Sequence, residues 1–243
     1  MRGALRRNGA TGVKKTDLKP WQKEEWCIPA VSPDFVWHME DVLDLYADPY
    51  DPCRPLVCFD ESPYQLVSET RSPIATAPGQ PQRYDYEYKR EGTANLFLIV
   101  QPLTSWRHVD VTERRTSKDF AGQMRAVVDE YFPEAECTKV VVDNLNTHSP
   151  AALYEAFPPA EARRITRKLE FHYTPKHGSW LNMAEIELAV LADQCLDRRL
   201  GSIENVRHEV AAWEADRNRD KASINWRFTT TTARTKLKRL YPQ

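Results

Sequence analysis

The stretches VVVDNLNTHS (140–149) and FHYTPKHGSWLNMAEIE (171–187) decide the fold and the site that we expect in this chain. In the first stretch, three valines predict a buried strand that ends at Asp143 in a polar turn. In the second, a short strand leads through a loop with proline and glycine into a helix that has Glu185 in its first turn. A carboxylate at the end of a buried element needs a compensating positive charge, and a divalent metal ion supplies it.

A third acid, Asp60, ends another apolar run, LVCF (56–59). If the strands at 56–59 and 139–142 are neighbours in one sheet, Asp60 and Asp143 converge at one edge, and Glu185 joins them from the helix. Enzymes that transfer phosphoryl groups with two divalent ions need about this set of oxygen ligands. Three carboxylates suffice because Mg²⁺ keeps several of its waters.

Each of these acids also has a purely structural interpretation. Asp60 precedes Glu-Ser-Pro and Asp143 precedes an asparagine, so both are also typical of turns. Asn182 and Glu185 have the spacing of a helix-capping pair. Glu187 is a rival for the third acid, and helical periodicity does not decide between it and Glu185.

The rest of the sequence predicts a mixed α/β sheet flanked by helices. Strands are expected at 56–59, 64–70, 84–90, 93–100, 107–111, 139–142 and 169–173. Helices are expected at 33–46, where Ser32 is the cap, and at 116–132, 151–168, 180–197 and 203–217. Consecutive strands followed by alternating helices and strands fit the ribonuclease-H-like architecture, in which the first and fourth strands lie side by side.

Composition excludes several classes of protein. With 243 residues, 41% hydrophobic and 28% charged, the chain is typical of a folded globular protein rather than a disordered one. It has no apolar run long enough to span a membrane and no signal-peptide core, so we expect it in the cytoplasm, away from membranes. The five cysteines are odd in number and scattered, which predicts reduced thiols.

Three separated blocks resemble one known family. CFDES (58–62), VVVDNLNTHS and HYTPKHGSWLNMAEIELAVL (172–191) look like the signature blocks of the DDE transposases of the Tc/mariner superfamily, in its bacterial insertion-sequence branch. The resemblance covers roughly residues 15–242. The family patterns strand-Asp-Glu-Ser/Thr, Asp-Asn-x-x-x-His and Leu-Asn-x-x-Glu fall on Asp60, Asp143 and Glu185. The resemblance therefore selects Glu185 over Glu187, although the gap from the second acid to the third is a little longer than is usual.

The resemblance implies an activity and its partners. Asp60, Asp143 and Glu185 are expected to hold two Mg²⁺ ions, for which Mn²⁺ can substitute. The implied reaction is hydrolysis at the ends of a DNA element, followed by attack of the freed 3′-hydroxyl on target DNA, with TA as the favoured target. The implied partners are the element ends, the target DNA and a second copy of the chain on DNA. The implied location is the bacterial nucleoid.

The chain departs from the family pattern at its beginning. Complete members start with helix-turn-helix modules, for which there is no room before residue 30. We therefore expect a basic extension and linker helix at 1–54, a ribonuclease-H-like DDE catalytic domain at 55–218 and a basic C-terminal tail at 219–243. An upstream helix-turn-helix product is a possible partner. The alternatives are a truncated or domesticated copy that only binds DNA or a partner, and another ribonuclease-H-like nuclease.

Residues around the acids are candidates for DNA contact. The set consists of Asn146, His148, Lys176, His177, Trp180 and Arg198. Lys176 and His177 form a basic loop before the third acid, where phosphates are easily held. The structural alternatives are that His148 is a hydrogen-bonding residue, that Trp180 packs in the core, and that Arg198 is a solvated helix end.

Overall fold

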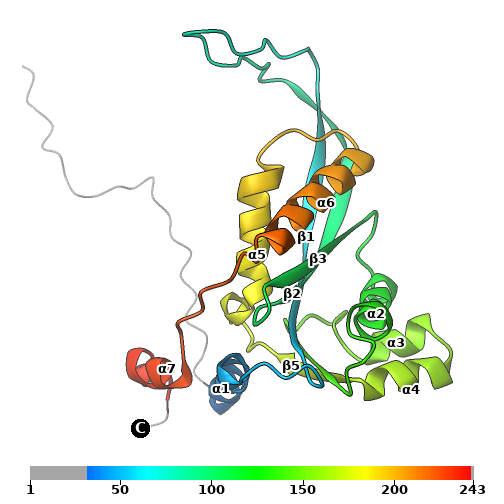
Figure 1. Ribbon diagram of the computed structural model, residues 1–243, viewed down its shortest axis with the longest axis vertical. Helices are drawn as coiled ribbons and strands as arrows, with labels where there is room; N and C mark the ends of the chain where they lie inside the picture. Colours follow the sequence, from blue (N-terminus) through cyan, green and yellow to red (C-terminus); the bar gives the residue numbers. More distant parts are fainter. Residues whose placement is uncertain (1–31, 242–243) are drawn as a thin grey trace, which may run out of the picture.

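A five-stranded mixed sheet organises the computed structural model, which describes residues 32–241 (Figure 1). The strands are β1 (Leu56–Glu69), β2 (Tyr88–Gln101), β3 (Trp106–Thr112), β4 (Thr138–Val142) and β5 (Leu169–Tyr173). Their spatial order is β3-β2-β1-β4-β5. The first three strands are antiparallel neighbours, whereas β4 runs parallel to β1 and β5 runs parallel to β4. The predicted α/β class and the predicted pairing of the first and fourth strands are confirmed.

Helices cover both faces of this sheet. They are α1 (Pro33–Ala47), α2 (Ser117–Ala126), α3 (Ala151–Ala156), α4 (Pro159–Arg167), α5 (Met183–Leu191), α6 (Ile203–Arg219) and α7 (Thr230–Lys236). Short 3-10 turns at Ser179–Leu181 and Lys238–Leu240 and π turns at Val127–Tyr131 and Ala192–Leu196 complete the helical segments. Figure 1 shows α2, α3 and α4 together on one side of the sheet, with α5 and α6 on the other.

The alternation of side chains along the central strands produces two cores. Val57, Phe59, Val140 and Val142 pack with α2, α3 and α4, while Cys58 and its neighbours pack with α1, α5 and α6. These strands are buried on both faces, which is why they read as unbroken apolar runs in the sequence. Asp60 directly follows Phe59 within β1 and Asp143 directly follows Val142 at the end of β4, so both cores support the candidate site.

Two pairs of predicted strands are continuous in the structure. The predicted strands at 56–59 and 64–70 form the single strand β1, and those at 84–90 and 93–100 merge into β2, which starts only at Tyr88. Beyond Cys58, β1 is paired with β2 and with no other strand of the described sheet. Pro63 lacks a backbone N–H and is tolerated there, because that part of β1 has a free edge.

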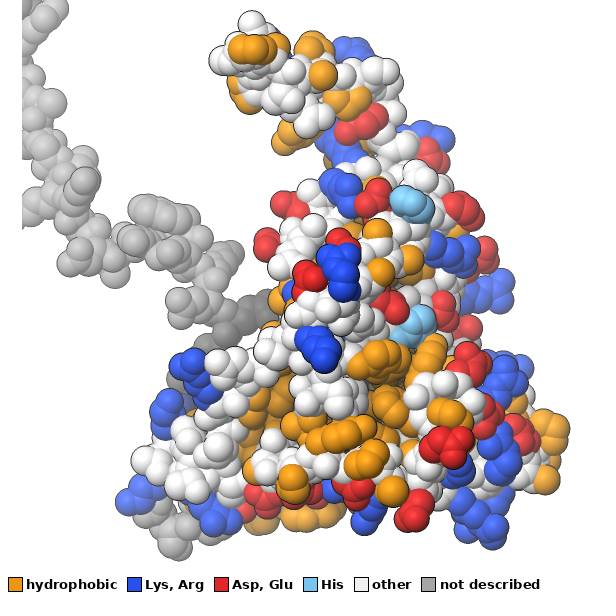
Figure 2. All heavy atoms as spheres, in the orientation of Figure 1, with side chains coloured by type: hydrophobic (Ala, Val, Ile, Leu, Met, Phe, Trp, Pro, Cys, Tyr) orange, Lys and Arg blue, Asp and Glu red, His pale blue; other side chains and the backbone are white. Residues whose placement is uncertain are grey.

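The outer parts of β1 and β2 project from the body as an arm (Figure 1). Most of the apolar side chains at its end are exposed, and Figure 2 shows them as orange patches. The exposed residues are Ile74, Tyr84, Tyr86 and Tyr88.

The predicted helix at 151–168 is divided into α3 and α4, because Pro158 and Pro159 interrupt it.

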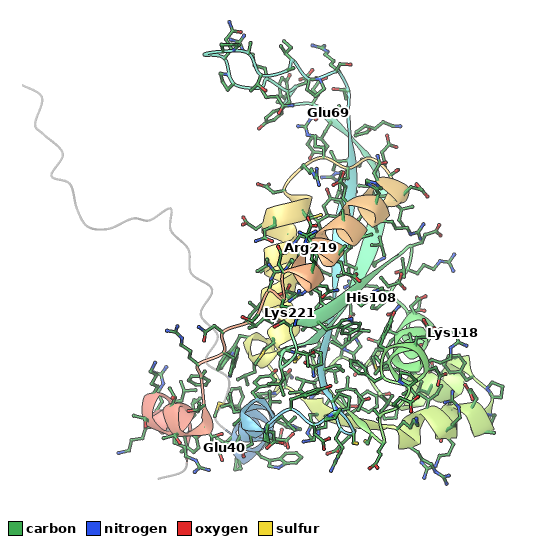
Figure 3. The ribbon with its side chains drawn as sticks, viewed as in Figure 1. Glu40, Glu69, His108, Lys118, Arg219 and Lys221 are labelled. Atoms are coloured by element: carbon green, nitrogen blue, oxygen red, sulfur yellow. The ribbon has the colours of Figure 1, made fainter. Side chains whose placement is uncertain are left out.

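The first and last helices described are packed against each other. Arg234 on α7 donates to Glu40 on α1 at 2.8 and 2.6 Å, and Glu40 is labelled in Figure 3. Met39 and Val42 on α1 are fully buried in the same core as α5 and α6.

The division of the chain at residues 54 and 218 stays a prediction, and residues 1–31, where the basic extension is expected, lie outside the described residues. Within 32–241, no helix has the length and apolar character needed to cross a bilayer.

Candidate active site

Asp60 and Asp143 lie level with each other at the point where β4 ends and β1 continues past it. The parallel register pairs Cys58 with Val141, so two further residues along each strand bring the chain to Asp60 and Asp143. Asp60 is only 8% exposed, and one of its carboxylate oxygens accepts a hydrogen bond from the backbone N–H of Glu61 at 2.8 Å. The order of the strands, which places β4 directly beside β1, therefore puts both acids at the carboxyl end of β4. The prediction that a strand ends at Asp60 is wrong, because pairing with β2 continues β1 to Glu69.

The third acid also lies near Asp60, because Asn182, three residues before Glu185, bonds to the carbonyl of Phe59, the residue directly before Asp60. Burial raises the pKa of the Asp60 carboxyl from 3.8 to about 7, and the negative charges of Asp143 and Glu185 add to the rise. The Glu61 backbone N–H opposes this rise by stabilising the carboxylate. Asp143, in the turn after β4, and Glu185, on α5, are therefore close enough to Asp60 for their charges to act on it. That the three carboxylates form one metal site stays a prediction.

Asn182 fixes the start of α5 next to Asp60. Its side-chain nitrogen donates to the Phe59 carbonyl at 2.7 Å, and its side-chain oxygen accepts from the Ala184 N–H at 3.1 Å. Asn182 is therefore the N-cap of α5, as the capping interpretation predicts. The reciprocal bond of a capping box is absent from the described residues, where the Glu185 carboxylate accepts no hydrogen bond, so this carboxylate is available to a ligand.

The rival acid, Glu187, faces a different environment. It is fully buried and forms ion pairs with Arg107 and Arg217. Glu185, by contrast, is half-buried, and its negative charge helps to raise the pKa of Asp60. The geometry therefore favours Glu185 as the third acid of the site.

His148 connects Asp143 to a fourth acid, Glu61. One ring nitrogen, Nδ1, bonds to Asp143, and the other, Nε2, lies 2.6 Å from Glu61. Burial alone lowers the pKa of His148, but the hydrogen bonds to Asp143 and Glu61 raise it to about 9. The ring is 1% exposed and has both nitrogens occupied, so the expectation that it contacts DNA does not fit the geometry. It holds Asp143 in place instead.

Glu61 is the residue that sequence reasoning missed. The signal was available, since Glu61 directly follows Asp60 and His148 closely follows Asp143 in the two quoted blocks. Their contact depends on the register of β1 against β4, which no local pattern reveals. Residues that bond to a metal ligand without binding the metal ion themselves orient that ligand.

The loop before α5 presents the predicted basic side chains to solvent. Lys176 and His177 are exposed, and His177 has the left-handed φ of 64°. Gly178 is required because a Cβ there would lie 2.5 Å from Pro175 Cγ. Trp180 is 44% exposed and makes an edge contact with Phe228 at 5.6 Å between ring centroids.

The other two candidates for DNA contact lie in different surroundings. Asn146 is exposed in the turn after Asp143. Arg198 is exposed too, but it is paired with Glu209 and donates to the Cys195 carbonyl at 2.9 Å. A DNA contact by either residue stays a prediction.

The donor set fits a hard divalent cation. Carboxylate oxygens are the preferred protein ligands of Mg²⁺ and Mn²⁺. The mutual repulsion that helps to raise the pKa of Asp60 is the effect that a cation relieves. As their side chains stand, no three metal-binding residues within 32–241 are close enough to hold one ion. The fit therefore rests on donor chemistry and on the convergence of the three acids.

Comparisons with known proteins identify a family and a fold. The family described as DDE superfamily endonuclease matches residues 55–207. Among solved structures, the chain is similar to the Mos1 mariner paired end complex with Mn, with a TM-score of 0.54 and 16% identity over 82% of this chain and 62% of that one. It is also similar to the Mos1 strand transfer complex, with a TM-score of 0.52 and 18% identity over 80% of this chain and 58% of that one.

These structural matches define the fold, which is ribonuclease-H-like, as predicted. The chain spans about three fifths of the length of the Mos1 chains that it matches. No match to the sequence was found among curated proteins.

Proposed function

Because the chain belongs to the DDE superfamily endonucleases, we propose that it is the catalytic domain of a DNA transposase of the Tc/mariner type. The observation that carries the proposal is the convergence of Asp60, Asp143 and Glu185 from three separate elements. The proposed reaction is cleavage of DNA at the ends of an element and transfer of the freed 3′-hydroxyl to target DNA. The proposed location is the bacterial cytoplasm, on the nucleoid.

Each part of the site has a proposed task. Asp60, Asp143 and Glu185 would hold two Mg²⁺ ions, or Mn²⁺ in their place, and these ions would supply activation of the attacking oxygen and stabilisation of the leaving one. His148, supported by Glu61, keeps the Asp143 carboxylate turned toward the site. Asn182 keeps the first turn of α5 against β1.

DNA is the proposed partner, and the exposed basic loop supports this. Lys176 and His177 contact backbone phosphates close to the acids, Trp180 stacks on a base, and Asn146 and Arg198 contact the flanking backbone. The Mos1 structures are described as a paired end complex and a strand transfer complex. By analogy, we propose that two copies of this chain act on two DNA ends, with an upstream helix-turn-helix product supplying end recognition.

Cleavage of an end-labelled duplex tests the proposal. The duplex carries the inverted repeat that flanks the reading frame, and the full chain is incubated with it in Mg²⁺ or EDTA. We expect cutting only with the metal ion, and loss of cutting in Asp143→Asn. Equal cutting by wild type and Asp143→Asn refutes the assignment of the site.

The same assay separates the alternatives. Joining of a 3′-hydroxyl end to a second duplex indicates a transposase, whereas cutting without joining indicates another ribonuclease-H-like nuclease. Salt-sensitive binding of the duplex without any cutting indicates a copy that only binds DNA.

A further inference from the structure

The rotation of α5 about its axis decides where Glu185 points, yet apolar packing specifies it weakly. Apart from Glu185 and Glu187, every residue of α5 is apolar. A helix that is apolar on all sides has no single stripe that must face the core. If α5 rotates about its axis by one residue position, every side chain turns by about 100°. Such a turn takes Glu185 away from Asp60 without exposing a distinctly polar or apolar face.

The contacts of Glu187 specify the rotation of α5 about its axis. Its Oε1 lies 2.8 Å from Arg107 Nε and 2.6 Å from Arg217 Nε, and its Oε2 lies 3.1 Å from Arg217 Nη2. Glu187 and Arg107 are both fully buried. Since residues two apart on a helix point about 200° apart, fixing Glu187 also fixes the direction of Glu185.

Both arginines are themselves held. The Arg107 backbone N–H donates to Asn218 Oδ1 at 2.9 Å, Asn218 Nδ2 donates back to the Arg107 carbonyl at 2.8 Å, and the Arg107 guanidinium donates to the Ala222 carbonyl. The Arg217 guanidinium lies over the Trp213 ring, 5.3 Å from its centroid. These contacts lie at the end of α6, where Arg219 and Lys221 are labelled in Figure 3. The cluster therefore joins α5 to β3 and α6.

Stability alone does not explain this arrangement. The Arg107 guanidinium and the Glu187 carboxylate are taken out of water completely, Arg217 remains 17% exposed, and burial lowers the pKa of Arg107. Well-packed apolar side chains in place of such a buried group are often equally stable or more stable. What Arg217 provides, and an apolar side chain does not, is a pair of directed hydrogen bonds to one side of α5. Arg107 adds a positive charge 2.8 Å from the same carboxylate, without the geometry of a hydrogen bond.

We propose that Glu187, Arg107 and Arg217, here called the α5 clamp, are positioning residues that set the rotation of α5 so that Glu185 faces Asp60. Asn182 fixes the start of the helix, and the α5 clamp fixes its rotation just beyond Glu185. The inference rests on the proposed function, because it assigns the clamp a task only if Glu185 is a metal ligand.

The test measures Mn²⁺ binding to the full-length protein by electron paramagnetic resonance, together with the thermal midpoint. The main variant combines Glu187→Leu, Arg107→Met and Arg217→Met, which keeps the site filled. Glu187→Gln is the second variant and serves as well if the triple variant does not fold. The matched control is Glu214→Gln, which removes another carboxylate from the contact of α6 with β3, where Glu214 bonds to His108 (labelled in Figure 3) and not to α5.

We expect both clamp variants to bind Mn²⁺ about 10- to 100-fold more weakly, as happens when other residues that orient metal ligands are lost. The triple variant is expected to keep the thermal midpoint of the wild type or exceed it. Glu214→Gln is expected to lower the midpoint without changing Mn²⁺ affinity. This combination separates positioning from a general loss of stability.

Two outcomes count against the inference, and they are distinguishable. If Glu185→Gln weakens Mn²⁺ binding but both clamp variants bind within twofold of the wild type, the positioning role is refuted and the proposed function stands. If Glu185→Gln itself binds Mn²⁺ like the wild type, the proposed ligand role of Glu185 fails, and the inference fails with it.

Discussion

Replacement of His148 by phenylalanine isolates the electrostatic task of this residue. The imidazole stacks on Phe120 at 4.9 Å and meets Phe59 edge-on at 5.3 Å, so a phenyl ring suits the same aromatic slot. The change removes both ring nitrogens. It leaves the Glu61 carboxylate, whose side chain is 6% exposed, buried without its partner, whereas Asp143 is 21% exposed and keeps some water.

The expected loss of stability follows from two independent estimates. Removing one partner of a buried ion pair costs about 3–5 kcal/mol, and here the Glu61 side carries most of it. The rise of the His148 pKa from 6.5 to about 9 corresponds to roughly 3 kcal/mol of stabilisation. Because the folded pKa lies above the unfolded one, this contribution is fully present below pH 6.5 and is lost as the pH rises through 9.

The measurement is urea unfolding of the full chain in EDTA, followed by tryptophan fluorescence. We expect His148→Phe to lower the free energy of unfolding by about 3 kcal/mol at pH 6 and by much less at pH 10. The double variant His148→Phe with Glu61→Met is expected to recover most of the loss, since no buried charge is left unpaired. A value for His148→Phe within about 0.5 kcal/mol of the wild type at pH 6 refutes the reasoning.

Three further changes test the supports around the site. Asn182→Ala removes the cap of α5 and leaves a buried carbonyl without its donor; we expect a loss of roughly 2–4 kcal/mol in urea unfolding. Gly178→Ala places a methyl group 2.5 Å from the ring of Pro175; we expect a loss of roughly 1–3 kcal/mol by the same assay. His108 is also partly buried, which alone lowers its pKa, but the hydrogen bond to Glu214 raises the pKa above 6.5 overall. The stability lost in His108→Gln should therefore be greatest below pH 6.5 and should diminish as the pH rises above that value, as thermal midpoints across pH will show.

Local patterns predicted the parts of the fold that depend on neighbouring residues. Ser32 caps α1 through a bond to the Phe35 N–H at 3.2 Å, and the apolar runs before Asp60 and Asp143 are the paired central strands. The continuity of β1 and β2 was not predictable in this way. Their outer parts were expected as separate strands at 64–70 and 84–90, and the pairing of β1 with β2 through Pro63 and Gly92 is what joins them to the inner strands.

The contacts that distinguish the acids were not accessible to the sequence either. Glu187 is conspicuous as an acid in an apolar helix, but its partners Arg107 and Arg217 lie on β3 and α6, far from it in the chain. His148 and Glu61 likewise meet only because β4 lies beside β1. Periodicity records which side of an element is buried, and it carries no information about which charged groups share that burial.

The distribution of cationic partners separates the candidate ligands from the structural acids. Glu61 and Glu187 each have a positively charged partner within the protein, namely a histidine with a raised pKa and a pair of arginines. Asp60 and Glu185 have no such partner within the described residues, and Asp143 shares its histidine with Glu61. Among the acids of the three quoted blocks, Asp60 and Glu185 therefore have no cation of their own within residues 32–241, and Asp143 has only a shared one. A bound divalent cation balances that charge, which is why we assign these three carboxylates, and not their neighbours in the same blocks, to the metal ions.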